Sequence, residues 1–506
     1  MLQKPRIGVV GGGASAVSLL DALAEEPDLP AGTIMVFEAS DHLWRGRPYR
    51  PDLDVVRVNA VPDDMSVRAG DSEHLYRWLA NRERLVGAKA SFTDPISGAQ
   101  FIPRAVFGDY LEQSARTALL TLLRRGWEPE LVRERVESAA HSVDGLVLRT
   151  ARGATYEVDY AVLSVGAGSP ADPYSLTGAE GFVKDPYPTV QELSHIDPAA
   201  DVAVIGSGLT AVDVVLALTH LGHRGRIRLL SRRGVLPSVR QRRVQHVLRH
   251  FKPSRFRAMA ARNETVTIAD LAAIMDMELR DAGEHSSTIR RELDNVSTEA
   301  PVARLRRQLG EVDSPSIALR ILQRAVPEAG PDVWPLLTEL EKDRFLAGYD
   351  REFESLCCPM PPRSAAVLLS LIDSDQLSLV TGVHNVETTA DGFMIETTHC
   401  DFRTGIVVSA VNGRQRKVSE EARSLVSSLV SAGLAEPHPH GGLRVERATS
   451  RLVVDSRPQP RLYALGDPAI GSIFFTVGME SLVDRAIDIV RSIRSDNAAW
   501  SQRATA

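Results

Sequence analysis

The sequence of 506 residues predicts an α/β fold in which two similar units, each built on a parallel sheet, carry a helical insertion. Three observations lead to this prediction. A glycine-rich turn between an apolar strand and an apolar helix occurs twice, and a small meander that leads into a buried strand also occurs twice. Inside the second unit lies a long stretch with the apolar spacing of helices. The chain is long enough for several domains, and its 43% hydrophobic content can fill their cores.

The two glycine turns both fit G-x-G-x-x-A. In that motif the glycines allow a tight turn and a close backbone approach to a pyrophosphate, and the helix that follows presents its N-terminus to the anion. One copy is a weak signal, but two copies predict two Rossmann-like dinucleotide-binding domains. A flavin and the nicotinamide nucleotide that reduces it are the natural pair. The expected cofactor-binding residues are Gly11, Gly13, Ala14 and Ser15 in the first turn, and Gly206, Ser207, Gly208, Leu209 and Thr210 in the second.

The second strand of the first unit, residues 33–37, ends at Glu38. A carboxylate at this position accepts hydrogen bonds from ribose hydroxyls, which both FAD and NAD possess. The alternative is a polar strand end without a ligand. Because the glycine turn lies upstream, we predict that Glu38 binds a ribose.

The equivalent strand of the second unit, residues 226–230, ends in Ser231, Arg232 and Arg233 instead. Arg233 occupies the position that corresponds to Glu38 when both are counted from their glycine turns. A hydroxyl and two guanidinium groups suit a 2′-phosphate, so the sequence favours NADPH in this unit. A solvated basic patch is the alternative, because further arginines follow.

Both units continue with a β-meander that feeds a buried strand, over residues 134–165 in the first and 382–411 in the second. Residues 237–356 separate the second glycine turn from its meander, and we expect a helical insertion that covers the cleft between the nucleotide domains as a substrate lid. A decoration that serves stability or dimerisation is the alternative. The expected division is an FAD-binding domain at 1–170 and 414–506, an NADP-binding domain at 171–236 and 357–413, and the insertion at 237–356.

Net charge, apolar runs and cysteine spacing argue against several classes of function. The formal net charge of −6 argues against a nucleic-acid partner. No apolar run approaches the length of a membrane span, and the first strand begins too soon after Met1 for a signal peptide, so we expect a cytoplasmic protein without a membrane partner. The three cysteines form no Cys-x-x-Cys pair after the first glycine turn, which counts against the dithiol flavoenzymes. Flavin electrons would then pass to oxygen or directly to a substrate.

Four further stretches resemble the two-dinucleotide-binding-domain flavoproteins that are related to class B flavin monooxygenases, in particular bacterial FAD/NAD(P)-binding proteins of specialised metabolism. Together with the glycine turns they span nearly the whole chain except the insertion. The stretches are RGRPY at 45–49 with RVNAVP at 57–62 and Met65, FIPR at 101–104 with residues 107–108 and 110–111, LLSRRG at 229–234 with residues 236–237, and LYALGD at 462–467 with Gly471 and FFT at 474–476.

The resemblance implies roles for residues outside the glycine turns. Gly466 and Asp467 match the motif whose aspartate binds the ribityl chain of FAD, although a helix N-cap would also account for Asp467. Asn59 matches the region that approaches the flavin ring and is the candidate catalytic residue; a turn asparagine is the alternative. Cofactor contacts are further expected from Arg104, which a surface salt bridge would also explain, from Val136 beside the adenine, and from Gly166 at the end of its strand.

The resemblance also has limits. Residues 181–188 keep only the aromatic-proline end of the Baeyer–Villiger fingerprint and lack its histidine, which disfavours lactone or ester formation. No substrate-reading motif of the ornithine or lysine N-hydroxylases is visible.

Tyr349 and Arg351 precede an unusual string, CCPMPPR, at the exit of the insertion, and we expect both in the substrate pocket. For the string itself, packing of small sulfur side chains beneath a proline turn is the alternative. His438 and His440 lack a completing cluster of ligands, so we expect no metal site.

We therefore predict an NADPH-dependent FAD monooxygenase that hydroxylates a small molecule with molecular oxygen. The resemblance favours oxidation at an amine nitrogen. An FAD-dependent NADPH reductase or dehydrogenase without oxygen insertion is the first alternative, and a redox sensor that binds both nucleotides is the second. The identity of the substrate and the formation of a homodimer stay open.

Overall fold

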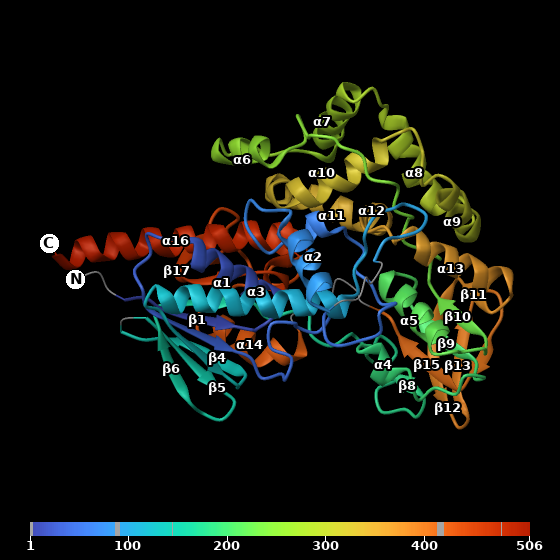
Figure 1. The fold of residues 1–506 in the computed structure, drawn as a ribbon, viewed down its shortest axis with the longest axis horizontal. Helices are drawn as coiled ribbons and strands as arrows, with labels where there is room; N and C mark the ends of the chain where they lie inside the picture. The colour runs from blue at the N-terminus through green and yellow to red at the C-terminus, as the bar shows by residue number, and fades with distance from the viewer. Residues whose placement is uncertain (1–3, 87–91, 144, 412–418, 477, 506) are drawn as a thin grey trace.

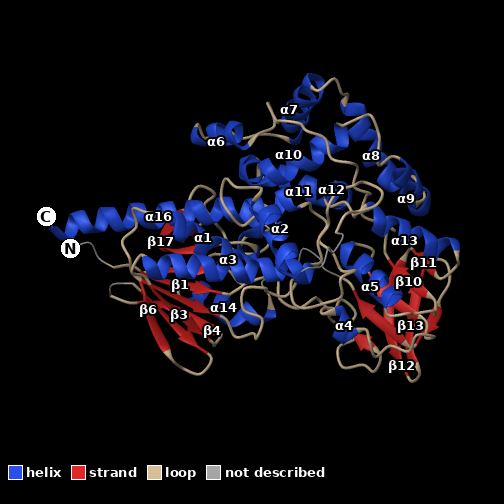
Figure 2. Ribbon diagram, viewed as in Figure 1, coloured by secondary structure: helices blue, strands red, loops and turns tan. Residues whose placement is uncertain are grey.

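The computed structural model describes residues 4–86, 92–143, 145–411, 419–476 and 478–505. It consists of two bodies that each contain a parallel sheet, with a layer of helices lying over both (Figure 1). Figure 2 shows the strands of the two bodies separated from each other by helices and loops. The predicted α/β fold, with two Rossmann-like units and a helical insertion, is therefore confirmed. The expected domain limit at residue 413 lies outside the described residues.

The first body is a six-stranded sheet with the strand order β16-β17-β7-β1-β2-β3, in which only β16 and β17 are antiparallel neighbours. Strand β1 is apolar and buried along most of its length, as expected of a strand covered on both faces. The strands are β1 (Arg6–Val10), β2 (Thr33–Phe37), β3 (Glu128–Val132), β7 (Tyr160–Leu163), β16 (Arg451–Val454) and β17 (Arg457–Ala464). One face carries α1 (Ala14–Glu25), α3 (Arg104–Arg124) and α16 (Met479–Thr505), and the other carries α14 (Arg423–Ser431) and the meander β4 (Val136–His141), β5 (Leu146–Thr150) and β6 (Thr155–Val158).

The second body repeats this plan with a five-stranded, all-parallel sheet in the order β11-β10-β9-β15-β8. Its strands are β8 (Phe182–Val183), β9 (Val202–Ile205), β10 (Ile227–Leu230), β11 (Leu377–Val380) and β15 (Ile406–Ser409). One face carries α4 (Thr189–Glu192), α5 (Leu209–His220) and α13 (Pro362–Asp373), and the other carries the meander β12 (Val383–Thr389), β13 (Gly392–Thr397) and β14 (Phe402–Thr404). Both predicted meanders are thus present.

The insertion forms the helical layer and has a hydrophobic core of its own. It rests on both bodies, because α10 contacts α16 of the first and α9 contacts α13 of the second. The indole Nε1 of Trp334 donates to the carbonyl oxygen of Gly471 at 2.8 Å, and its ring stacks on Phe474 with centroids 4.3 Å apart. Its elements are α6 (Pro253–Ala261), α7 (Ile268–Asp281), α8 (Ser286–Thr298), α9 (Pro301–Gly310), α10 (Ala318–Val333), η2 (Trp334–Leu336), α11 (Glu339–Gly348) and α12 (Asp350–Cys357).

Short elements complete the first body. They are η1 (Pro62–Met65), α2 (His74–Val86), η3 (Glu420–Ala422), η4 (Asp467–Ala469) and α15 (Ile470–Ile473). In the part of the chain that the structure describes, no helix combines the length and the apolar character that crossing a membrane requires.

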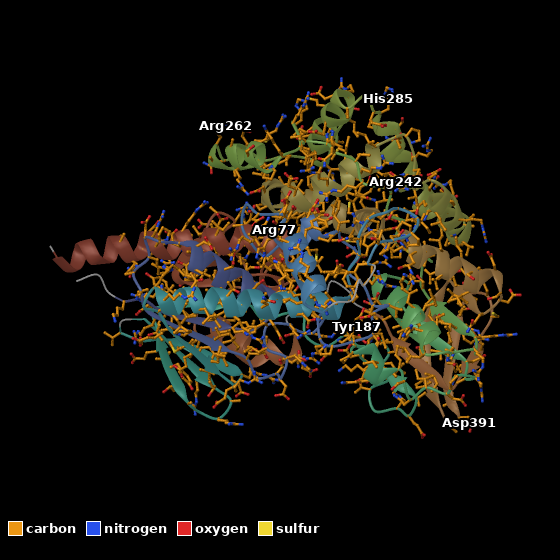
Figure 3. The ribbon with its side chains drawn as sticks, viewed as in Figure 1. Arg77, Tyr187, Arg242, Arg262, His285 and Asp391 are labelled. Atoms are coloured by element: carbon orange, nitrogen blue, oxygen red, sulfur yellow. The ribbon has the colours of Figure 1, made fainter. Side chains whose placement is uncertain are left out.

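Buried charges hold the two bodies together. Arg104 Nη2, at the start of α3, lies 2.7 Å from Asp213 Oδ2 on α5, and the Tyr187 hydroxyl donates to the same oxygen at 2.5 Å. The guanidinium carbon of Arg104 lies 5.2 Å from the centre of the Tyr187 ring. Figure 3 shows Tyr187 between the two bodies. Although burial alone would lower it, the Asp213 carboxylate raises the pKa of Arg104, so the arginine stays charged.

The loop that follows β2 makes a second connection. Arg47 forms two hydrogen bonds of 2.6 Å with the Asp185 carboxylate. Asp52 accepts the N–H of Thr189 at 2.8 Å and the N–H of Val190 at 3.0 Å, and so binds the first turn of α4. This loop of the first body therefore fixes the segment through which the chain enters the second.

Substituting Arg104 tests the buried pair. We expect Arg104→Met to lower the free energy of unfolding by about 3–5 kcal/mol, because Asp213 would stay buried without its counter-charge. Adding Asp213→Leu should recover much of the loss, since neither charge is then buried alone. The exposed pair of Arg306 and Asp373 is the control, and Arg306→Met should leave the free energy of unfolding nearly unchanged. Urea titrations measure these three variants and Asp213→Leu alone; losses that simply add in the double variant would contradict the coupling.

Glu278 on α7 is fully buried and binds the loop before α6. Its carboxylate accepts the backbone N–H groups of Arg249 at 3.0 Å, His250 at 2.6 Å and Phe251 at 2.9 Å, and lies 2.9 Å from His246 Nε2. Burial by itself would raise the pKa of Glu278, but these donors outweigh it and lower the pKa to about 2. The carboxylate therefore stabilises the fold above its unfolded pKa, and this contribution disappears as the pH falls towards 2.

We expect Glu278→Gln to destabilise the protein by about 1–3 kcal/mol at pH 7, because the amide leaves buried N–H groups without acceptors. The difference from the wild type should shrink as the pH is lowered from 4.5 towards 2. Thermal unfolding across this range measures the effect, with Glu264→Gln at an exposed pair as the control. A deficit that is equally large at both ends of the range would contradict the assignment.

Candidate active site

The two glycine turns have the same backbone geometry. Gly11 has a φ of +107° and Gly206 a φ of +120°, in the region that favours glycine. A Cβ atom on Gly11 would lie 2.6 Å from the carbonyl oxygen of Ser164, and one on Gly206 would lie 2.9 Å from that of Ala410. Ser164 follows β7 and Ala410 follows β15, the strands that adjoin β1 and β9. Each turn is therefore pressed against the neighbouring strand end, where a side chain has no room.

The Glu38 carboxylate is hydrogen-bonded to the backbone of the first glycine turn. Its Oε2 accepts the N–H of Gly12 at 2.9 Å, and its Oε1 accepts the N–H of Ser40 at 2.8 Å. Each carboxylate oxygen keeps a second acceptor position. The residue is thus held at the carboxyl end of β2, where such folds place the acid that binds a ribose. The ribose contact itself stays a prediction.

The ends of β7 and β17 meet the same turn. Gly466 has a φ of +84°, and a Cβ atom there would lie 2.8 Å from Ser15 Oγ on α1. A Cβ atom on Gly166 would lie 3.8 Å from Asp467 Oδ2. Burial raises the pKa of Asp467, and a hydrogen bond from the backbone of Ala167 offsets this only in part. A buried carboxyl group therefore lies beside the turn, where it can bind hydroxyl groups of a ligand.

Two further observations at this edge fit an FAD. Thr476 Oγ1 is buried and has no hydrogen-bond partner among the described residues. Buried hydroxyls in native folds are nearly always paired, so this group suits a polar ligand. Val136, at the start of β4, is buried in one cluster with Phe37 and Val132 at the ends of β2 and β3. Thr476 and Val136 are therefore compatible with a bound FAD, and their contacts with it stay predictions.

In the second body, two serines link the glycine turn to the end of β10. Ser207 Oγ donates to the carbonyl oxygen of Val235 at 2.8 Å and lies 3.1 Å from Ser231 Oγ. Ser231 Oγ in turn accepts the N–H of Gly234 at 3.0 Å, and the exposed Arg232 follows directly. The strand end that we expect at a 2′-phosphate therefore lies against the turn.

Helix α12 of the insertion reaches this turn. Arg233 Nη2 forms an ion pair with Glu352 Oε1 at 2.6 Å. Arg351, expected in the substrate pocket, has its Nη2 3.9 Å from the position of a Cβ atom on Gly208. The structure thus gives Arg351 a place beside the nucleotide turn, and its contact with a substrate stays a prediction.

Asn59 lies where the first body meets the insertion. Its Nδ2 is 3.4 Å from the carbonyl oxygen of Pro359, so the cysteine-proline string passes beside it. Tyr349, which is 47% exposed, precedes α12, the helix that leads into this string. Roles for Asn59 in catalysis and for Tyr349 in substrate binding stay predictions.

Glu480 is a further acidic residue close to the same junction, and it is absent from the site residues expected from the sequence. It lies in the first turn of α16, which contacts η1, and Asp64 in η1 is 3.5 Å from Arg243 of the segment before α6. Partial desolvation, followed by the charges of Asp64 and Glu328, raises the pKa of Glu480, although its side chain stays exposed to solvent, which screens these charges. No motif marks it, because acidic residues are common in the first turn of a helix.

Asp213, Tyr187 and Glu352 are likewise absent from the sequence-based site. An aspartate inside the otherwise apolar helix α5 is a usable signal, since a buried carboxylate requires a partner. Tyr187 and Glu352 carry no local signal, because their partners lie far away in the sequence.

The two histidines considered as metal ligands belong to a hydrogen-bonded loop. The N–H of His440 donates to His438 Nδ1 at 3.1 Å, and His440 Nε2 lies 3.1 Å from Glu339 Oε2. Within the described ranges, no group of three or more His, Cys, Asp or Glu side chains could hold a metal ion.

Comparison with known proteins agrees with this geometry. Residues 8–168 match the model of the FAD-NAD(P)-binding family, and they contain the first glycine turn, Glu38 and the meander. Uncharacterized proteins of Mycobacterium bovis and Mycobacterium tuberculosis are 26% identical over 325 residues, which is 55% of this chain. The match spans 60% of the length of these relatives.

Solved structures extend the likeness over the whole chain. The L-lysine 6-monooxygenase from Pseudomonas syringae is 16% identical with a TM-score of 0.59, over 98% of this chain and all of that one. The ornithine N-hydroxylase of Kutzneria sp. 744 is 16% identical with a TM-score of 0.56, over 98% of this chain and all of that one. The ornithine hydroxylase of Pseudomonas aeruginosa is 15% identical with a TM-score of 0.58, over 97% of this chain and 99% of that one. The resemblance to two-dinucleotide-binding-domain flavoproteins is therefore confirmed at the level of the fold: the chain has the fold of these lysine and ornithine monooxygenases, and residues 8–168 of its first body match the FAD-NAD(P)-binding model.

Proposed function

We propose that this chain is an NADPH-dependent FAD monooxygenase that hydroxylates a small molecule at an amine nitrogen. One observation carries the proposal. Two glycine turns of equal geometry occur in separate sheets, and the strand ends beside them differ in charge, with Glu38 in one and Ser231, Arg232 and Arg233 in the other. An acid suits the free hydroxyls of a ribose, and arginines suit a 2′-phosphate.

The first body would hold FAD. The glycine turn and the start of α1 would bind its pyrophosphate, Glu38 a ribose, Asp467 the ribityl chain and Val136 the adenine. Once bound, FAD supplies the redox chemistry, accepting hydride from NADPH and passing electrons to oxygen. Among the protein groups near the junction, Asn59 can donate or accept hydrogen bonds through its side-chain amide.

The second body would hold NADPH. Gly206, Gly208 and the start of α5 would bind its pyrophosphate. Ser231 and Arg232 would bind its 2′-phosphate, with Arg233 available when it leaves Glu352. Closure of the site by the insertion would exclude water from the reacting groups.

An amine is the substrate class that the fold relatives suggest. Their names state lysine and ornithine as substrates, and a further solved relative, from Erwinia amylovora, is a cadaverine monooxygenase. Tyr349 and Arg351 remain proposed substrate residues, with Arg351 shared with the nucleotide site. We also propose a cytoplasmic location and keep a homodimer as a proposal.

Spectroscopy of the purified protein tests this function. We expect a yellow protein that contains FAD and that NADPH bleaches rapidly without oxygen. On mixing with oxygen, a transient absorbance distinct from that of oxidised and of reduced flavin should precede reoxidation. Immediate return to oxidised flavin would indicate the reductase instead. A protein that stays colourless after incubation with FAD would refute both.

Removal of the strand-end arginines tests the nucleotide preference. We expect the double substitution Arg232→Ala with Arg233→Ala to raise the KM for NADPH about 10-fold or more, because charge-assisted bonds to the 2′-phosphate are lost. The KM for NADH should change little, since NADH lacks that phosphate. Steady-state reduction of the flavin with each nucleotide measures the effect, with Arg226→Ala on the same strand segment as the control. Equal changes for both nucleotides would contradict the assignment.

A further inference from the structure

Helix α12 belongs to the insertion by sequence, but its first turn lies at the second glycine turn. Arg351 Nη1 pairs with Glu354 Oε2 at 2.6 Å, and its Nη2 donates to the carbonyl oxygen of Val235 at 3.3 Å. These contacts hold the guanidinium beside Gly208, where its Nη2 lies 3.9 Å from the position of a Cβ atom. Among the described residues beyond the chain neighbours of Gly208 and the backbone of its helix, no other atom comes within 4 Å of that position.

Among the residues that the structure describes, the first turn has no charged side chain at the equivalent place. A Cβ atom on Gly13 would face only backbone atoms of Gly46, at 3.5 and 3.8 Å. A guanidinium group at the second turn therefore distinguishes the two nucleotide sites, although their glycine turns share one geometry.

The location of Arg351 also has an electrostatic consequence. The N-terminus of α5 carries the positive end of the helix dipole, which favours anions and disfavours cations nearby. Glu354 compensates the arginine only in part, because both side chains are about one-third exposed, at 37% and 32%. An anion between the turn and the guanidinium would satisfy both positive groups, and a guanidinium binds phosphate oxygens through two parallel hydrogen bonds.

The next residue of α12 acts on a different part of the same site. Glu352 is mostly buried, with a side chain 12% exposed, and pairs with Arg233 at 2.6 Å. Arg233 is one of the strand-end arginines assigned to the 2′-phosphate. While the ion pair is formed, the Glu352 carboxylate competes with that phosphate for the guanidinium.

We propose that α12 is part of the nicotinamide-nucleotide site, with Arg351 as a ligand of the pyrophosphate and Glu352 as a residue that weakens the preference for a 2′-phosphate. The inference rests on the proposed function, since it assumes that the second body binds NADPH. The pyrophosphate is common to NADH and NADPH, whereas the 2′-phosphate occurs in NADPH alone. The two residues should therefore have different signatures.

Equilibrium binding of NADP⁺ and NAD⁺ to the FAD-containing protein, measured by calorimetry, separates the two roles. Arg351→Ala should raise the Kd of both nucleotides by a similar factor of about 10 or more, and Arg351→Lys should recover part of the loss. Glu352→Gln should lower the Kd of NADP⁺ several-fold and leave that of NAD⁺ unchanged. Arg344→Ala is the matched control, because Arg344 forms the same type of helical ion pair, with Glu341 at 2.7 Å on α11.

Each other outcome overturns a defined part of the proposal. Unchanged affinities in both Arg351 variants would remove the pyrophosphate role. Weaker binding of both nucleotides to Glu352→Gln would mean that the ion pair only supports the fold, which FAD content and the thermal midpoint would also report. A wild-type protein that binds neither nucleotide would refute the proposed function itself rather than the role of α12.

Discussion

The buried group of Arg104, Asp213 and Tyr187 is the contact on which the geometry of the molecule depends. It joins α3 of the first body to α5 of the second through one carboxylate oxygen, at distances of 2.7 and 2.5 Å. Charges in such a place are costly unless they are paired and hydrogen-bonded, so the group tolerates few alternative domain orientations. Because α5 begins at the second glycine turn, the same contact fixes that turn relative to the first body.

Arg104 also shows how a residue at a family position can hold a structural ion pair, which was the alternative considered for it. The resemblance implied that Arg104 contacts the cofactor. In the structure, the guanidinium of Arg104 binds Asp213 and lies over the ring of Tyr187. A flavin contact stays a prediction for this residue. The partner that explains its burial lies more than a hundred residues away, and nothing in its neighbourhood in the sequence indicates that partner.

The features that could be predicted are those with a local cause. The glycine turns follow from short motifs, and each turn donates to the end of the adjacent strand in the same way, from Gly11 to Phe37 at 2.9 Å and from Gly206 to Leu230 at 2.8 Å. Strand 33–37 is found at its expected limits, because its residues form a short apolar run. The order of strands within each sheet and the ion pair of Arg233 with Glu352 depend on contacts between distant segments, and no local pattern encodes them.

The insertion is held in place by contacts with both bodies. Trp334 binds the backbone at Gly471 next to the Gly466-Asp467 motif, while Glu352 pairs with Arg233 at the end of β10. A single helical layer thus touches the edges of both nucleotide-binding sheets. Its helices bury a common core, so both contacts belong to one packed layer. The insertion therefore bridges the two sites, which a lid attached to one domain alone could not do.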